Sequence, residues 1–379
     1  MDVYLDNNAT TKVSKEVFEA MIPYFNEEFG NPSSLHTKGI KIKKVLNQSR
    51  KIISDLLGVN RNEIYFTGSG TESNNWALKG LAFSNTTKSE IITTKIEHHS
   101  ILHTCNFLES LGFTVHYLDV DQDGFIMIDQ LSSLINDNTL VVSIIMANNE
   151  IGTIQNIKQI SKICDANSTY FHIDAIQAAT HTMFDLKDTG VDLASISGHK
   201  FHAPKGIGLL YVKEGTKITN LIHGGQQEYG LRSGTENIPY IVGLAKAMKI
   251  GFNQLNDYET KLNNISKSFL KDLDNANIDY KLNGPKIGKN RLPGNLNLSF
   301  RNIDGMSLSF LLNKQGVYVS TGSACDTESI DISHVIKAIN IPQQYQSATL
   351  RISFSTSLTK DEIEYATKII INTIKSEQN

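Results

Sequence analysis

The chain contains 379 residues, with 36 basic and 39 acidic side chains and a formal net charge of −3. At about 150 residues per domain this length predicts two or three domains, and the near-neutral charge argues against a dedicated nucleic-acid-binding protein. The longest apolar run, residues 140–147, is far shorter than the ~20 residues that span a membrane. Three widely spaced cysteines, Cys105, Cys164 and Cys325, do not form the pattern of a disulfide framework or a metal site, and no secretory leader follows Met1. We therefore expect a cytoplasmic protein without a bound metal.

Strand-like and helix-like patterns alternate over the first half of the chain. Apolar residues recur at helical spacing over residues 14–29 and 39–57, and the second stretch ends at Gly58, where a helix C-terminus favours glycine. Seven short runs rich in β-forming residues follow, mostly separated by helical patterns such as 100–111 and 157–166. They cover residues 63–67, 90–94, 114–118, 140–146, 170–174, 193–197 and 207–212. This alternation predicts an α/β fold with a mainly parallel seven-stranded sheet covered on both faces.

The pattern changes after the glycine-rich stretch 223–234. Residues 239–275 predict one long helix, and beyond it strand patterns at 295–300, 318–320 and 349–354 mix with helical patterns at 305–313 and 360–374. Thr359 and Glu362 have the spacing of a helix capping box. We expect an N-terminal segment (1–12), a large α/β domain (13–251) and a smaller α+β domain (252–379).

Ligands of parallel sheets bind beyond the carboxyl ends of the strands, so the residues that follow each strand are candidates for a site. Residues 68–74 combine glycines with Thr71 at a helix N-terminus, which suits a phosphate, although an ordinary strand-to-helix turn has the same pattern. The run lacks the Gly-Lys-Ser/Thr ending of a P-loop. His98 and His99 follow the next strand, where a ring could stack on a cofactor, move protons or cap a helix.

Polar residues also follow the central strands. Asn148 and Asn149 are either turn residues or hydrogen-bonding groups for a ligand. Asp174 ends an otherwise apolar strand, and an unpaired buried carboxylate costs several kcal/mol. We therefore expect Asp174 to have a partner, either an arginine or a protonated ring nitrogen.

Lys200 and Cys325 are the candidate reactive side chains. Lys200 follows a strand within Ser-Gly-His-Lys, where a desolvated lysine could form a Schiff base, although most lysines are solvated surface charges. Cys325 lies in a run of small residues, Gly-Ser-Ala-Cys, outside any apolar helical pattern. This context predicts an accessible and reactive thiol, with a merely exposed cysteine as the alternative.

In their order along the chain, these motifs resemble those of the NifS-like cysteine desulfurases, in the class V aminotransferase branch of pyridoxal-phosphate (PLP) enzymes. The resemblance runs from the opening Tyr-Leu-Asp-Asn-Asn-Ala-Thr-Thr (4–11) to the last helix. It includes the motifs at 30–34, 71–75, 148–152, 197–200, 232–236 and 322–325. Asn8 departs from the family, which usually has alanine there. The resemblance implies the PLP-dependent transferase fold type I and a homodimer.

The resemblance also implies roles for individual residues. Lys200 would bind PLP covalently, Asp174 would pair with the pyridinium nitrogen, and His98 would stack on the ring and assist proton movements. Asn149 and Arg351 would bind the substrate amino acid. The remaining cofactor contacts implied by the family are Gln177 and Asn149 at the ring hydroxyl and Gly70, Thr71, Ser197 and His199 at the phosphate, joined by Thr235 of the partner subunit.

The implied reaction converts L-cysteine to L-alanine, with Lys200 moving the α-proton and the sulfur left as a persulfide on Cys325. The sulfur would then pass to an acceptor protein, namely a tRNA-thiolating enzyme, a thiamine-pathway carrier or an iron–sulfur scaffold, without direct contact with nucleic acid or membrane. Three alternatives stay open: a selenocysteine lyase or a cysteine sulfinate desulfinase of the same branch, and a non-enzymatic scaffold of the same fold.

Overall fold

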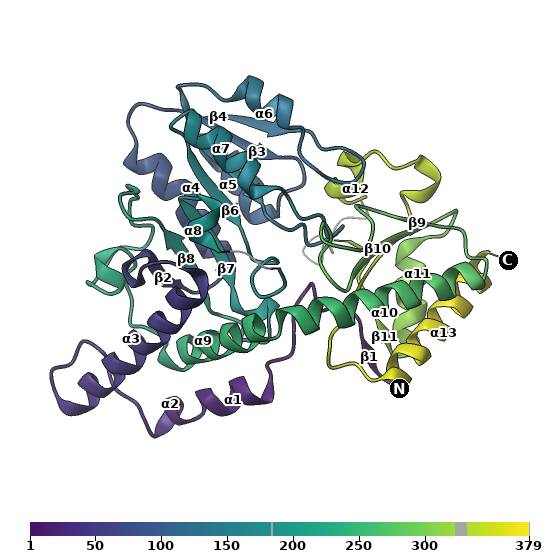
Figure 1. The fold of residues 1–379 in the computed structure, drawn as a ribbon, viewed down its shortest axis with the longest axis horizontal. Coiled ribbons are helices and arrows are strands. Elements are labelled where there is room, and N and C mark those ends of the chain that lie inside the picture. Colours follow the sequence, from purple (N-terminus) through teal and green to yellow (C-terminus); the bar gives the residue numbers. More distant parts are fainter. Residues whose placement is uncertain (183–184, 323–331, 379) are drawn as a thin grey trace.

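The computed structural model describes residues 1–182, 185–322 and 332–378, so Cys325 lies outside the described residues. A large sheet with helices on both faces fills the upper left of Figure 1, and a second group of strands and helices lies at the lower right. Helices α9 (Ile238–Asn253) and α10 (Leu255–Asn275) run between them. Both ends of the chain lie on the side of the second group (Figure 1).

The large sheet has seven strands in the order β2-β8-β7-β6-β5-β3-β4. All of its strands run in one direction except β8, which is antiparallel to both neighbours, so the predicted mainly parallel sheet is confirmed. The reversal follows from the connection: residues 198–207 are too few for the crossover of about a dozen residues that a parallel pair needs. The strands are β2 (Ile64–Thr67), β3 (Glu90–Thr94), β4 (Thr114–Leu118), β5 (Thr139–Ile145), β6 (Tyr170–Asp174), β7 (Leu193–Ser197) and β8 (Gly208–Val212).

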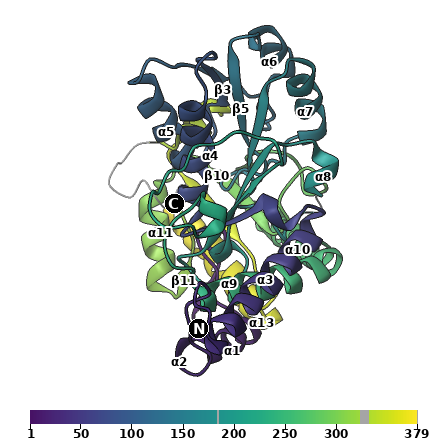
Figure 2. The ribbon, with the colours of Figure 1, turned by 90° about the vertical axis from the view of Figure 1, so that its left-hand side faces the viewer.

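Alternating strand residues build the core on the two faces of this sheet. Val141 of β5 belongs to the buried cluster with Trp76 of α4 (Gly70–Ser84) and Cys105 of α5 (His99–Glu109). Its neighbour Val142 belongs to the opposite cluster, with Ile160 of α7 (Ile157–Ala166). Figure 2 shows the sheet between α4 and α5 on one side and α6 (Ile128–Leu134), α7 and α8 (Leu186–Thr189) on the other. Each fully buried aliphatic side chain stabilises the fold by about 1.5–3 kcal/mol.

The second group is built on a three-stranded antiparallel sheet in the order β12-β10-β9. It has an apolar cluster of its own, which includes Phe269, Phe300 and Ile370. The N-terminal strand β1 (Val3–Tyr4) pairs in parallel with β11 (Val317–Tyr318), so the first residues of the chain join this group. Its other elements are β9 (Tyr280–Leu282), β10 (Asn295–Phe300), β12 (Thr349–Ser353), α11 (Gly305–Lys314), α12 (His334–Ala338) and α13 (Lys360–Gln378).

Two of the predicted helices are interrupted. The stretch 14–29 contains α1 (Lys15–Met21) and α2 (Pro23–Asn26), because Pro23 has no N–H to continue the first helix and is well placed to begin the second. The stretch 239–275 is divided between α9 and α10 at Gln254, whose ψ of 4° is not helical. The capping box of α13 is confirmed: Thr359 N donates to Glu362 Oε2 at 2.7 Å, and Glu362 N donates to Thr359 Oγ1 at 3.2 Å.

The remaining elements of the described residues are α3 (Thr37–Leu57) and four short 3₁₀ turns at Arg61–Glu63, Gly198–Lys200, Glu228–Gly230 and Gln343–Tyr345. Within the described ranges, no helix is both long enough and apolar enough to cross a bilayer. The same residues contain no cluster of three or more histidine, cysteine, aspartate or glutamate side chains that could hold a metal ion.

Candidate active site

A cavity of about 460 Å³ lies at the carboxyl ends of the parallel strands. Its wall is made by the segments that follow β2, β3, β5, β6 and β7, which reach the same edge because these strands run in one direction. The structure thereby brings together nine residues that the sequence predicted for the site: Gly70, Thr71, His98, Asn149, Asp174, Gln177, Ser197, His199 and Lys200.

Asp174 provides the buried carboxylate of the cavity and is only 2% exposed. Its Oδ1 accepts a hydrogen bond from Ile176 N at 3.0 Å, and its Oδ2 accepts one from Asn74 Nδ2 at 2.7 Å. Burial raises the pKa of Asp174, while these hydrogen bonds and the charge of Lys200 act in the opposite direction. A cation entering the cavity would therefore be stabilised by this carboxylate, as a protonated ring nitrogen requires.

Lys200 reaches the cavity from the 3₁₀ turn that follows β7. Its Nζ donates to the carbonyl oxygens of Asn8 at 2.7 Å and Ala9 at 2.9 Å. Gln177 Nε2 donates to the same Asn8 oxygen at 2.7 Å. The N-terminal segment thus forms one wall of the cavity and holds the amine of Lys200 beside it.

The N-terminus of α4 forms a cradle that fits a phosphate. Ser69 caps this helix, with its Oγ accepting from Glu72 N at 3.1 Å. A Cβ on Gly70 would lie 2.3 Å from Ile176 Cδ1 and 3.0 Å from Ser197 Cβ, so only glycine lets the backbone come this close. Lys205 also lines the cavity. Backbone N–H groups and the positive end of a helix of 15 residues favour an anion at this position.

His98 caps the N-terminus of α5 with its side chain. Its Nδ1 accepts from Ser100 N at 3.1 Å and lies 2.8 Å from Ser100 Oγ, so the neutral ring carries its proton on Nε2. Asn74 Nδ2 donates to Ser100 Oγ at 2.8 Å and also to Asp174. A chain of hydrogen bonds through Asn74 and Ser100 therefore connects His98 to Asp174, and sequence reasoning gave neither linker a role.

His199 also lines the cavity, as a neutral ring. Burial, together with the charges of Lys200 and Lys205, lowers its pKa to about 4. Its Nδ1 lies 3.1 Å from the hydroxyl of Thr10. An uncharged imidazole can take part in binding a phosphate only through a hydrogen bond. The positive charge at this position would therefore come from Lys205 and from the N-terminus of α4.

Arg351 of β12 lies next to the cavity rather than in its lining. Its Nη1 donates to Asn149 O at 3.4 Å, and its Nη2 lies 2.8 Å from Asp6 Oδ1. The Arg351 side chain is only 1% exposed, and its Nε has no hydrogen-bond partner within the described residues. A guanidinium with a spare buried donor beside Asn149 fits the role of binding a substrate carboxylate.

The described residues on either side of the segment 323–331 contact Arg351 and Glu150. On one side, Ser320 and Arg351 exchange two backbone hydrogen bonds of 3.2 and 2.7 Å. On the other side, Ser333 Oγ donates to Glu150 Oε2 at 2.7 Å. Thr235 does not line the cavity and is exposed, so its contact with a phosphate in a partner subunit stays a prediction.

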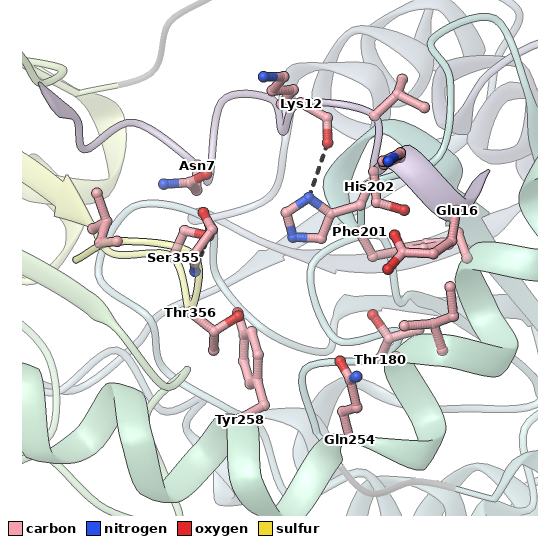
Figure 3. Close-up of a pocket in the computed structure, with 18 of the residues that line it drawn as sticks. Asn7, Lys12, Glu16, Thr180, Phe201, His202, Gln254, Tyr258, Ser355 and Thr356 are labelled. Atoms are coloured by element: carbon pink, nitrogen blue, oxygen red, sulfur yellow. Dashed lines mark hydrogen bonds between the residues drawn. The ribbon is translucent and has the colours of Figure 1, made fainter. Parts of the chain in front are cut away.

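A second, larger cavity of about 1100 Å³ is lined in part by Asn7 and Lys12 of the N-terminal segment (Figure 3). Lys12, His202 and Tyr258 face it, and Lys12 O lies 2.9 Å from His202 Nδ1. None of the nine predicted residues lines this cavity. We therefore assign the chemistry to the smaller cavity, which combines a lysine, a buried carboxylate and an anion cradle.

Comparison with known proteins gives one consistent answer. A model of the family described as Aminotransferase class-V matches residues 3–366. The chain is 46% identical over 374 residues to a protein of Clostridium botulinum named "Cysteine desulfurase IscS", covering 98% of this chain and 94% of that one. A solved structure titled "NIFS-LIKE PROTEIN" is similar with a TM-score of 0.93 and 39% identity, over 99% of this chain and 100% of the other. Another, titled "SspA in complex with cysteine", has a TM-score of 0.82 and 37% identity, over 93% and 98% of the two chains. The chain belongs to the class V aminotransferase family, among its NifS-like cysteine desulfurases.

Proposed function

We propose that this protein is a PLP-dependent cysteine desulfurase that converts L-cysteine to L-alanine and carries the sulfur as a persulfide on Cys325. The observation that carries the proposal is the single cavity in which Lys200, Asp174 and the α4 cradle meet beside Arg351. Near-full-length similarity to a relative named cysteine desulfurase and to a structure titled as a complex with cysteine supports the choice of substrate.

The cavity has the groups that PLP needs. Lys200 would hold the cofactor covalently, Asp174 would face its ring nitrogen, and the α4 cradle would take its phosphate. When bound, the cofactor supplies an electron sink for the substrate's α-carbon. A neutral His98 with its proton on Nε2 would present a flat face and an N–H donor to that ring.

The protein's own residues would then bind the amino acid and move its proton and sulfur. Arg351 would bind the carboxylate, and the Lys200 amine would take the α-proton. The Cys325 thiolate would attack the substrate sulfur, so that an S–S bond forms as the Cβ–S bond breaks. The electron pair of the broken bond stays with the substrate carbon, which takes up a proton to become the methyl group of L-alanine. A thiol or an acceptor protein later removes the sulfur.

We further propose a homodimer, in which Thr235 of each subunit would complete the phosphate site of the other. Thr235 is exposed and lies on the loop that follows the 3₁₀ turn Glu228–Gly230, outside its own cavity. The sulfur acceptor is an iron–sulfur scaffold, a tRNA-thiolating enzyme or a thiamine-pathway carrier. Because an acceptor cysteine can take the persulfide sulfur only as a free thiol, and cytosolic thiols are kept reduced, the cytoplasm is the compartment that we propose.

The test is to incubate the purified, PLP-loaded protein with L-cysteine and a thiol reductant and to quantify L-alanine and sulfide together. We expect equal amounts of both products from the wild type and neither from Cys325→Ala. A Cys105→Ala variant is the matched control, because Cys105 is a buried core cysteine away from the cavity. Full activity in Cys325→Ala would contradict the persulfide route and favour a lyase acting on another substrate.

A further inference from the structure

The opening motif of the chain, residues 4–11, has no role in the reaction proposed above, and yet it reaches into the site. Leu5 N donates to Tyr318 O at 2.9 Å, and Leu5 O accepts from Ser353 N at 2.7 Å. Asp6 forms an isolated parallel bridge with Ser353, two residues after Arg351. These backbone contacts fix Asp6 between β11 and β12, beside Arg351.

The Asp6 carboxylate pairs directly with Arg351. Asp6 Oδ1 lies 2.8 Å from Arg351 Nη2, and the two side chains are 18% and 1% exposed. A buried guanidinium without a counter-ion is strongly unfavourable, so this ion pair is what allows Arg351 to remain buried beside Asn149. The ion pair also fixes the orientation of the planar guanidinium group, because Nη2 donates to Asp6 while Nη1 donates to Asn149 O.

The ion pair with Asp6 leaves some N–H groups of the Arg351 guanidinium available for a ligand. Asp6 engages Arg351 through one oxygen, and Nε of Arg351 is buried without a hydrogen-bond partner in the described part of the chain. An unsatisfied buried donor of this kind is costly, and the carboxylate of an amino acid would satisfy it. A longer group at position 6, or one without an oxygen that accepts from Nη2, would not hold the guanidinium at this angle.

We propose that Asp6 is a positioning residue that orients Arg351 to bind the carboxylate of the amino-acid substrate. This inference rests on the proposed function, because it takes an amino acid as the ligand of this cavity. Asn8 supports the same arrangement from the next turn of the segment: its Nδ2 donates to Asn149 O at 3.2 Å, and its N donates to Ser353 Oγ at 2.9 Å. The opening motif would thus fix both Arg351 and the backbone of Asn149 beside the position of the substrate carboxylate.

The test compares two ligands that differ only in the carboxylate, L-alanine and ethylamine, by their effect on the visible absorbance of the PLP-loaded protein. In Asp6→Ala we expect the Kd for L-alanine to rise at least about tenfold, because hydrogen bonds to a charged group are lost, while the Kd for ethylamine stays unchanged. Asp6→Asn keeps an oxygen that can accept from Nη2 and should recover most of the affinity for L-alanine.

Asp2→Ala is the matched control, since Asp2 lies in the same segment but accepts its hydrogen bond from Tyr318 Oη at 3.1 Å. If Asp6→Ala does not fold, Asp6→Glu replaces it and should also weaken L-alanine binding, because the carboxylate is displaced by one methylene. An unchanged or lower Kd for L-alanine in the folded variant overturns the inference. If the wild type makes no L-alanine from L-cysteine, the proposed function fails instead.

Discussion

The buried ion pair between Arg50 and Glu228 allows a sharp prediction about stability. Arg50 Nη1 and Nη2 lie 2.8 and 2.6 Å from the two oxygens of Glu228, and the side chains are only 4% and 2% exposed. Glu228 Oε2 also accepts from Phe66 N at 2.9 Å. Glu228 and Tyr229 have φ values of 44° and 58°, a left-handed conformation that costs non-glycine residues about 1–2 kcal/mol each. The pair therefore holds a strained turn onto the end of β2.

Replacing one partner leaves the other as an uncompensated buried charge. We expect Arg50→Met to lower the free energy of unfolding by about 3–5 kcal/mol, since Glu228 would keep only the Phe66 N–H as a donor. This is a large part of the 5–15 kcal/mol that typically stabilises a domain. The double variant Arg50→Met/Glu228→Gln should recover part of the loss, because no charge then remains buried.

The assay is urea unfolding followed by circular dichroism, on proteins of equal cofactor content. Lys51→Met is the matched control: the neighbouring pair Lys51–Asp55 is 58% and 60% exposed, so its loss should change stability by less than about 1 kcal/mol. A loss below about 1 kcal/mol in Arg50→Met, or a double variant less stable than Arg50→Met itself, would refute the reasoning.

Three further predictions concern the pH dependence, the cofactor cradle and a buried arginine. Burial raises the pKa of Glu97 from 4.5 to about 8, so the folded state keeps a proton that the unfolded state has lost. Stability should then fall by up to about 1.4 kcal/mol per pH unit between these values, and Glu97→Gln should flatten this slope in urea unfolding at pH 5.5, 6.5 and 7.5. Gly70→Ala places a methyl group 2.3 Å from Ile176 Cδ1 and should raise the Kd for PLP by at least about tenfold in an absorbance titration. An unchanged Kd would contradict the assignment of the α4 N-terminus as the phosphate site. Arg291 is 2% exposed and donates to the carbonyl oxygens of Asn283, Pro285 and Asn295. Arg291→Met should therefore lower the free energy of unfolding, measured by thermal unfolding, by about 3–5 kcal/mol. A loss of stability near zero would mean that water satisfies these carbonyl groups instead.

The candidate site could be predicted from the sequence to the extent that it depends on local patterns. Strands that run in parallel place their carboxyl ends at one edge, so chemistry-bearing residues found after separate strands had to come together. Asp174 and Lys200 were predicted on this basis, and they do line one cavity. The interrupted helix at Pro23 was also within reach, because proline lacks the N–H that continues a helix.

The sequence alone could not supply contacts between distant segments. Asp6 forms an ion pair with Arg351, 345 positions away in the sequence, and no periodicity or turn pattern in either segment predicts this contact. The connection from His98 to Asp174 through Ser100 and Asn74 is likewise made by side chains of different helices and strands. The packing of β1 against β11 and of α4 against α5 determines which of these side chains meet, and this packing depends on the whole chain.

The sequence by itself therefore determined the strand–helix alternation, the edge of the sheet at which chemistry gathers, and the residue types present there. Only the tertiary structure decided which groups face each other: the N-terminal segment as the wall beside Lys200, Asp6 as the counter-ion of Arg351, and Thr235 outside its own cavity. The physical reason is that hydrophobic periodicity is a local property of the chain, whereas a buried charge requires a specific partner that any part of the chain can provide.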